Sequence, residues 1–341
     1  MILLRLVVDG YGKFIGKRDN QIVVKENGHE LDYFLAEELS QVIVTGKGSV
    51  GFDALKLLAQ NQVDLVVLNW TGDIIYRLSP PELRNVEARR EQYSAYQDIR
   101  SGFLCKEFIR AKIENQRAVL RSLARSREKN NADLSFRLIK HRDVISEYVN
   151  RLNNMVNVPV EDLRGEIFGL EGQSSIEYWK GISLVINPDF GFKSRSGRGA
   201  QDGVNALLNY GYGLLRGEVW RAVHLSALDP YAGYLHADRW GRPSLVFDLM
   251  EEFRQQIVDR SVLKLINRRQ IKADNFTMED SLCRILDKDR RTLIAQILKR
   301  LDSTIKINGR KTKWSSLIIR QARLLAKYLT GKDEYRGFYL R

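Results

Sequence analysis

Two adjacent prolines, Pro80 and Pro81, constrain the fold of this chain more than any other feature. Consecutive prolines lack the backbone donors that the interior of a helix or strand requires, so neither element can continue through this point. The chain has no proline between residues 82 and 158, and none after Pro243. The sequence therefore predicts a boundary here between two domains, residues 1–80 and residues 81–341.

The pattern of apolar residues differs on the two sides of this boundary. Before it, short β-branched and aliphatic runs alternate with glycines, which is typical of strands. The expected strands are Leu3–Val8, Gln21–Val24, Gln41–Val44, Val63–Leu68 and Ile74–Tyr76, with a short helix over Ala54–Ala59. After the boundary, apolar residues recur at helical spacing, and the expected helices include Leu245–Asn267, Glu279–Leu301 and Ser315–Leu329. The predicted fold class is α+β, a small N-terminal β-rich domain followed by a larger, mainly α-helical domain.

The charge of the chain is concentrated in the second domain. The 341 residues include 55 basic and 42 acidic side chains, which gives a net charge of +13. Residues 1–80 hold 8 basic and 10 acidic side chains, so the whole positive surplus follows Pro80. A basic body attached to a nearly neutral module favours a polyanion such as nucleic acid as the partner.

The sequence also predicts where the protein works. No apolar run is long enough to cross a membrane, and the first residues lack the pattern of a signal peptide. The two cysteines, Cys105 and Cys283, lie far apart and form no metal-binding or redox motif. We therefore expect a soluble protein of the reducing cytoplasm with no membrane partner.

A glycine motif at residues 46–51 resembles a dinucleotide-binding site. Gly46, Gly48 and Gly51 follow a strand-like run, and Asp64 comes after them at roughly the distance of a ribose-binding acid. However, fewer than 80 residues lie before the proline boundary, which is too short for the further βα units of a dinucleotide fold. A simple turn between strands is favoured, and a dinucleotide-binding oxidoreductase stays a distant alternative.

Acidic residues and one histidine stand out in the second domain. Glu171 lies between glycines at the expected start of a helix over Ser174–Ile182, and His236 lies in a loop rich in aromatic residues. Asp248, Glu251 and Glu252 would share one face of a helix. Carboxylates with one imidazole form a hard, open site that suits Mg²⁺ or Mn²⁺ better than a closed zinc site.

Each of these residues also has a structural interpretation. Glu171 could simply favour a helix dipole, and Arg254 and Arg260 could compensate the acidic face.

Two basic segments favour phosphate contacts. The residues expected to bind DNA are Lys193, Arg195 and Arg198 in a Gly/Ser-rich loop, and Arg310, Lys311 and Lys313 near the C-terminus.

The order of these motifs resembles one known family. The segments that carry the resemblance are residues 169–172 with Tyr178-Trp179, residues 202–212, residues 230–236 and residues 248–254. Together they resemble the CRISPR-associated integrase and endonuclease that is the first of the CRISPR adaptation proteins. The resemblance covers nearly the whole chain.

The resemblance implies a metal-dependent DNA endonuclease and integrase that joins spacer 3′-hydroxyl ends into a CRISPR array. It implies an N-terminal domain used for dimerisation, a homodimer, and a complex with the second CRISPR adaptation protein. The DNA substrates would be double-stranded, branched, and CRISPR repeat and spacer ends. By position, Glu171, His236 and Glu251 would bind Mg²⁺ or Mn²⁺.

Two further residues have roles that the resemblance implies. Asp248 would be an essential acid, either a ligand or a supporting group, and Asn205 would hold the site or the substrate. The number of metal ions stays open at this point. The alternatives are a non-catalytic DNA-bridging scaffold, in which Arg254 and Arg260 pair with the acids, and a restriction-type or junction-resolving nuclease. The latter usually places its carboxylates on a central sheet, and the second domain shows no such strand pattern.

Overall fold

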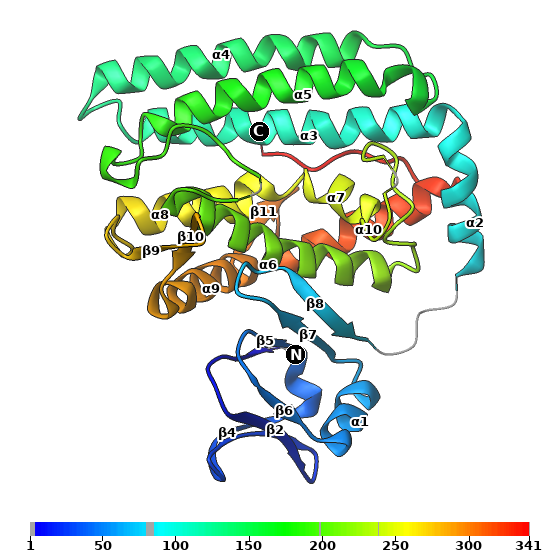
Figure 1. Ribbon diagram of the computed structural model, residues 1–341. Helices are drawn as coiled ribbons and strands as arrows, with labels where there is room; N and C mark the ends of the chain where they lie inside the picture. Colours follow the sequence, from blue (N-terminus) through cyan, green and yellow to red (C-terminus); the bar gives the residue numbers. More distant parts are fainter. Residues whose placement is uncertain (1–3, 80–84, 198, 238, 341) are drawn as a thin grey trace. The chain divides into compact units, whose positions relative to one another are not determined.

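The computed structural model describes residues 4–79, 85–197, 199–237 and 239–340. The chain divides into two compact units, Met1–Glu82 and Leu83–Arg341 (Figure 1). Pro80 and Pro81, on which the expected boundary rests, lie outside the described residues. The roles expected of the two units, dimerisation for the first and catalysis with DNA binding for the second, stay predictions.

The N-terminal unit contains two four-stranded sheets and one helix. One sheet has the order β1-β5-β7-β8 and the other β4-β3-β2-β6. The bounds are β1 Leu4–Val8, β2 Lys13–Arg18, β3 Gln21–Glu26, β4 His29–Leu35, β5 Leu39–Val44, β6 Gly48–Val50, α1 Phe52–Gln60, β7 Asp64–Leu68 and β8 Ile74–Leu78. Buried aliphatic side chains from both sheets and from α1 form one core. The five expected strands and the short helix are confirmed, with ends shifted by at most two residues.

The glycine motif serves the close approach of two strands. β6 pairs in parallel with β2, and a side chain on Gly48 would collide with the Lys13 carbonyl oxygen. A side chain on Gly46 would likewise collide with the Gly10 backbone. Asp64, in the position of a ribose-binding acid, forms an ion pair with Arg77. The expected simple turn between strands is wrong, because Gly48–Val50 within the motif forms the strand β6.

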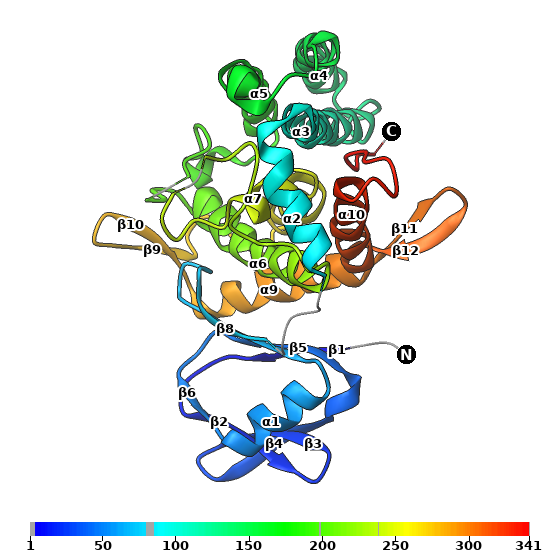
Figure 2. The same cartoon turned by 90° about the vertical axis from the view of Figure 1, so that its right-hand side faces the viewer.

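The second unit is mainly α-helical, which confirms the predicted fold class. Helices α3, α4 and α5 lie side by side and form one layer, and α6, α7, α8 and α10 form the next (Figures 1 and 2). The helix bounds are α2 Val86–Ser94, α3 Ile99–Arg125, α4 Ala132–Asn154, α5 Val160–Ser183, α6 Gly203–Leu225, α7 Ser244–Met250, α8 Arg260–Asn267, α9 Asp287–Asp302 and α10 Trp314–Leu329. None of the helices in the described ranges has the length and apolar character needed to cross a membrane.

Two of the expected helices are interrupted, and the third, Ser315–Leu329, is confirmed as α10. The segment Leu245–Asn267 forms α7, a turn, a π-helical turn over Gln255–Asp259 and then α8. Such π-turns are rare and are frequent at functional sites. The segment Glu279–Leu301 begins as a hairpin of β9, Phe276–Glu279, and β10, Leu282–Ile285. Asp280 and Ser281 both have positive φ angles, the geometry of a two-residue hairpin turn, so α9 begins only at Asp287.

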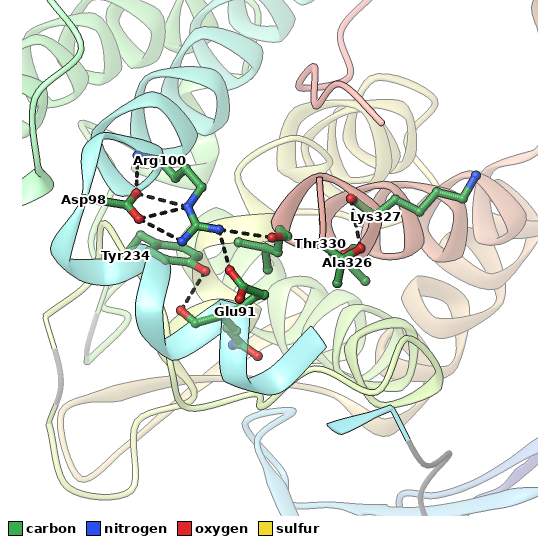
Figure 3. A network of polar contacts seen from close by, with 9 residues as sticks. Glu91, Asp98, Arg100, Tyr234, Ala326, Lys327 and Thr330 are labelled. Atoms are coloured by element: carbon green, nitrogen blue, oxygen red, sulfur yellow. Dashed lines mark hydrogen bonds and ion pairs between the residues drawn. The ribbon is translucent and has the colours of Figure 1, made fainter. Parts of the chain in front are cut away.

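Short polar contacts at α2 fix the loop that leads to His236. The buried side chain of Gln92 donates to the carbonyl oxygens of Asp229 and Ala232 and accepts from the Asp229 amide. The Tyr234 hydroxyl donates to the Gln92 carbonyl oxygen at 3.1 Å (Figure 3). Arg100, at the start of α3, binds the α2 carboxylate of Glu91 and the carbonyl oxygen at the end of α10. The loop is consequently bonded to α2, and Arg100 links α2 to α3 and α10.

Candidate active site

One cavity in the helical unit brings together residues that lie far apart in the sequence. It measures about 680 Å³ and is lined by Glu171, His236 and Glu251, the three expected metal ligands. Glu171 belongs to α5, and Glu251 directly follows α7. His236 lies in the loop that connects α6 and α7. The fold therefore places all three side chains around the same space.

Glu171 lies in the middle of α5, so the expected helix start at this residue is wrong. The flanking Gly169 and Gly172 are helical, and a side chain at either position would meet no atom within 4 Å. Glycine disfavours a helix interior, but the packing of α5 against α3 and α4 outweighs this preference. The Glu171 carboxylate is consequently positioned by helix packing and not by the dipole of a first turn.

A buried lysine lies between the two glutamates. Nζ of Lys112, on α3, is 2.5 Å from Glu171 Oε1 and 2.7 Å from Glu251 Oε2. Burial alone would lower the pKa of Lys112, but the charges of Glu171 and Glu251 outweigh it and raise the pKa. Burial would also raise the pKa of Glu251, but the positive charges of Arg254, Lys112 and His236 lower it to about 2. Both carboxylate charges are thus neutralised by protein cations.

Asp248 holds the His236 ring in one orientation. Its carboxylate is fully buried and accepts hydrogen bonds from the backbone amides of Tyr234, Leu235 and His236. Asp248 Oδ1 also lies 2.6 Å from His236 Nδ1. Because Nδ1 is engaged by the carboxylate, Nε2 is the ring nitrogen left for a ligand. Asp248 is absent from the cavity lining, and these contacts of its carboxylate are all with the loop that carries His236.

The residue types around the cavity fit a hard divalent cation. Two carboxylates and one imidazole are suitable ligands for Mg²⁺ or Mn²⁺. Glu251 Oε2 is buried and, among the described residues, receives no well-aligned hydrogen bond, although Lys112 is near. Within those residues, no three His, Cys, Asp or Glu side chains are close enough to hold an ion together. The ligand types therefore fit, with the Lys112 ammonium lying between the carboxylates that would bind the metal.

The expectation that Asp248, Glu251 and Glu252 share one helix face is wrong. The helix α7 ends at Met250, and the turn that follows sends Glu252 away from the cavity. The Glu252 carboxylate instead accepts hydrogen bonds from the Tyr335 hydroxyl, the Gln321 amide and the Phe338 backbone. Burial raises the pKa of Glu252 to about 7. Asp248, Glu251 and Glu252 therefore contact different parts of the protein, although they are close in sequence.

Asn205 lies outside the cavity lining and fixes the loop that forms one wall. Its side chain accepts from the Ser196 amide at 2.8 Å and donates to the Ser194 carbonyl oxygen at 2.9 Å. It also accepts from Arg195 at 3.0 Å. These bonds hold the loop that carries Lys193 and Arg195 into the cavity.

The expected basic residues fall into separate places. Lys193 and Arg195 line the cavity, and Arg198 lies outside the described residues. Arg310, Lys311 and Lys313 belong to strand β12, Arg310–Lys313, and are absent from the cavity lining. Of the two arginines expected to compensate the acids, Arg254 lies 3.0 Å from Glu251, whereas Arg260 donates to Ser122.

Comparison with known proteins decides which family the chain belongs to. The family model described as "CRISPR associated protein Cas1" matches residues 6–299. The chain belongs to the Cas1 family. This confirms the resemblance seen in the sequence motifs and places the chain in the endonuclease and integrase family of CRISPR adaptation.

Individual relatives agree over the full length of the chain. The protein named "CRISPR-associated endonuclease Cas1 1" of Archaeoglobus fulgidus is 45% identical, covering 98% of this chain and 99% of the relative. "CRISPR-associated protein Cas1 3" of Methanobrevibacter ruminantium is 33% identical, covering 99% and 100%. Among solved structures, a casposase bound to an integration product is 26% identical with a TM-score of 0.83, covering 98% of this chain and 92% of that one.

The contacts of two cavity tyrosines in this Cas1 chain, Tyr178 and Tyr212, are not evident from the sequence. Tyr212 has the guanidinium groups of Arg195 and Arg254 over its ring, at 5.2 and 4.9 Å from the ring centre. The hydroxyl groups of Tyr212 and Tyr178 donate to Asp259, at 2.5 and 2.9 Å. Only tertiary packing reveals this arrangement. Lys112 does leave a sequence signal, because it interrupts the apolar face of a long helix.

Removing Lys112 should destabilise the metal-free protein. In Lys112→Met, the buried carboxylates of Glu171 and Glu251 lose a shared counter-charge, which we expect to cost about 3 kcal/mol of unfolding free energy. Denaturant unfolding in the presence of EDTA measures this loss, with Lys140→Met on the exposed face of α4 as the control. A variant as stable as wild type would show that Lys112 does not neutralise the pair.

The Asp259 carboxyl should make stability depend on pH. Burial raises the pKa of Asp259 to about 6, against the hydrogen bonds from Tyr212 and Tyr178. The folded state therefore keeps a proton that the unfolded chain releases near pH 4, and this stabilisation falls away as pH rises through 6. Relative to Asp259→Asn, wild type should lose about 2 kcal/mol between pH 4 and pH 7, measured by denaturant unfolding. A constant difference between the two proteins would contradict this.

Proposed function

We propose that this Cas1 chain is a metal-dependent DNA endonuclease and integrase that cleaves DNA and joins spacer 3′-hydroxyl ends into a CRISPR array. The observation that carries the proposal is the convergence of Glu171, His236 and Glu251 on one cavity, with Asp248 orienting the histidine. Glu171, His236 and Glu251 would hold Mg²⁺ or Mn²⁺, which stabilises charge that develops on phosphate oxygens. Work on a CRISPR array would place the chain in the cytoplasm.

The residues of the chain supply the rest of the chemistry. Asp248 keeps Nδ1 of His236 engaged, so Nε2 is presented to the cavity. Lys193, Arg195 and Arg254 line the same cavity and give it the positive charge that a phosphodiester requires. Water as the nucleophile would give strand cleavage. A DNA 3′-hydroxyl would give joining, which exchanges one phosphodiester for another without an external energy source.

The proposed partners follow from the family. We propose that the chain acts as a homodimer through its N-terminal unit, together with the second CRISPR adaptation protein. The similar casposase, whose solved structure is bound to an integration product, supports DNA ends as substrates. The proposed DNA is double-stranded or branched, with CRISPR repeat and spacer ends.

A non-catalytic DNA-bridging scaffold is the second candidate. Its support is that Lys112 and Arg254 already neutralise Glu251. The two candidates differ in their response to metal. A scaffold would show no stabilisation by Mn²⁺, whereas a protein that binds the ion gains stability as its concentration rises.

A joining assay tests the proposed function. Wild type and His236→Ala would be given branched and linear DNA, with Mn²⁺ or with EDTA. With Mn²⁺ we expect joined product from wild type and none from His236→Ala, and with EDTA we expect none from either. His141→Ala is the control, because His141 pairs with Glu177 outside the cavity lining. Equal product from wild type and His236→Ala would overturn the proposal.

A further inference from the structure

A short ribbon in the helical unit has two chemically different faces. Strand β11, Thr304–Ile307, pairs with β12 in antiparallel register, and the ribbon projects beside α10 (Figure 2). Lys306 lies opposite Lys311, and Thr304 lies opposite Lys313. Directly paired residues share a face, and side chains alternate along each strand. One face therefore carries Thr304, Lys306, Lys311 and Lys313, and the other carries Ile305, Ile307, Arg310 and Thr312.

The isoleucines of the ribbon are partly covered. Ile305, Ile307 and Thr312 are half-buried on one face, where Arg310 is exposed. On the other face Lys306 and Lys311 are exposed and Lys313 is half-buried. Among the described residues, none of the three lysines has a carboxylate within ion-pair distance. Like charges directly opposite each other destabilise a ribbon. The lysine face thus concentrates positive charge that nothing in the described chain neutralises.

We propose that the lysine face of this ribbon binds the phosphate backbone of double-stranded DNA outside the cavity. The proposal rests on the proposed function, since it assumes DNA as the substrate. Alternate residues on a strand are about 6.7 Å apart, which is about the length of helix axis over which one DNA strand carries two phosphates. Lysine acts as a point charge toward phosphate, and the face offers no amide or aromatic group to read bases. The contact is therefore independent of sequence.

The ribbon geometry changes the expected set of DNA-binding residues. Lys311 and Lys313 stay in it, and Lys306 joins them although the basic run in the sequence does not include it. Arg310 lies on the opposite face, so it is assigned no contact with this DNA segment. Sequence adjacency places Arg310 next to Lys311, but the strand alternation separates them.

Salt-dependent binding tests the lysine face. The affinity for a DNA duplex would be measured by fluorescence anisotropy in EDTA across a range of salt concentrations. Each lost phosphate contact flattens the plot of log affinity against log salt by about 0.9, so the triple variant Lys306→Ala/Lys311→Ala/Lys313→Ala should flatten it by about 2.7. Lys140→Ala, an exposed lysine on α4, is the control for charge alone.

Single substitutions test the face assignment. Lys311→Ala should flatten the slope by about 0.9, and its neighbour Arg310→Ala should leave it unchanged. The single variant also carries the test if the triple variant folds poorly. Equal flattening by the two single variants would overturn the assignment of the DNA contact to one face. An unchanged slope in the triple variant would overturn the proposal and would fit a protein partner better. Failure of wild type to bind DNA at all would instead overturn the proposed function.

Discussion

Glu251→Gln is expected to abolish both cleavage and joining. The glutamine keeps the shape of the side chain but removes the charge that a divalent ion requires, and Glu171→Gln should behave in the same way. We expect rates to fall by at least about 10²–10³-fold, the scale seen when a group that stabilises charge in a transition state is removed. Single-turnover cleavage and joining assays with Mn²⁺ measure the effect.

The two substitutions should lower the rates of cleavage and joining without weakening DNA binding. The affinity for DNA in EDTA should stay near the wild-type value, because Lys193 and Arg195 still line the cavity. Glu166→Gln is a matched control, since Glu166 is an exposed glutamate on the same helix as Glu171. If Glu171→Gln and Glu251→Gln both kept near-normal activity with Mn²⁺, the assignment of the site would be wrong.

Asp248→Asn should have the second largest effect. The amide group cannot accept all of the hydrogen bonds that the carboxylate takes from Tyr234, Leu235 and His236. A buried donor left without a partner costs about 1–3 kcal/mol of stability. We also expect the affinity for Mn²⁺ to fall by about 10–100-fold, because the histidine ligand loses its orienting partner.

Two measurements separate these effects of Asp248→Asn. Denaturant unfolding in EDTA measures the loss of stability, and calorimetric titration of the folded variant with Mn²⁺ measures the loss of metal affinity. A lower stability with unchanged Mn²⁺ affinity would assign Asp248 to the fold alone. Both values are expected to change, since the same carboxylate binds the loop backbone and the ring.

Local patterns in the sequence account for much of the fold. The proline pair and the period of the apolar residues give the fold class, the five strands and the helix α10. Strand β4 was missed because most of its residues are exposed, and β2 because Gly16 and its charged residues interrupt the expected pattern. The expected helix over Leu245–Asn267 is interrupted in a segment that is buried on several sides. The spacing of apolar residues does not show where such a helix is interrupted.

The candidate site was predicted in part. The resemblance to the family implied that Glu171, His236 and Glu251 act together, and the structure puts all three around one cavity. The position of Glu171 within α5 was missed, because its flanking glycines indicate a helix end when packing is ignored. The contacts of Lys112 join α3 to α5 and to the turn after α7, and only the tertiary structure brings these elements together.

Anomalous diffraction from crystals grown with Mn²⁺ tests the central claim most directly. The account predicts a manganese peak bound by the carboxylates of Glu171 and Glu251 and by Nε2 of His236, with the Lys112 ammonium displaced from between the glutamates. A peak bound by other residues, or a fully occupied Lys112 bridge at saturating Mn²⁺, would contradict it.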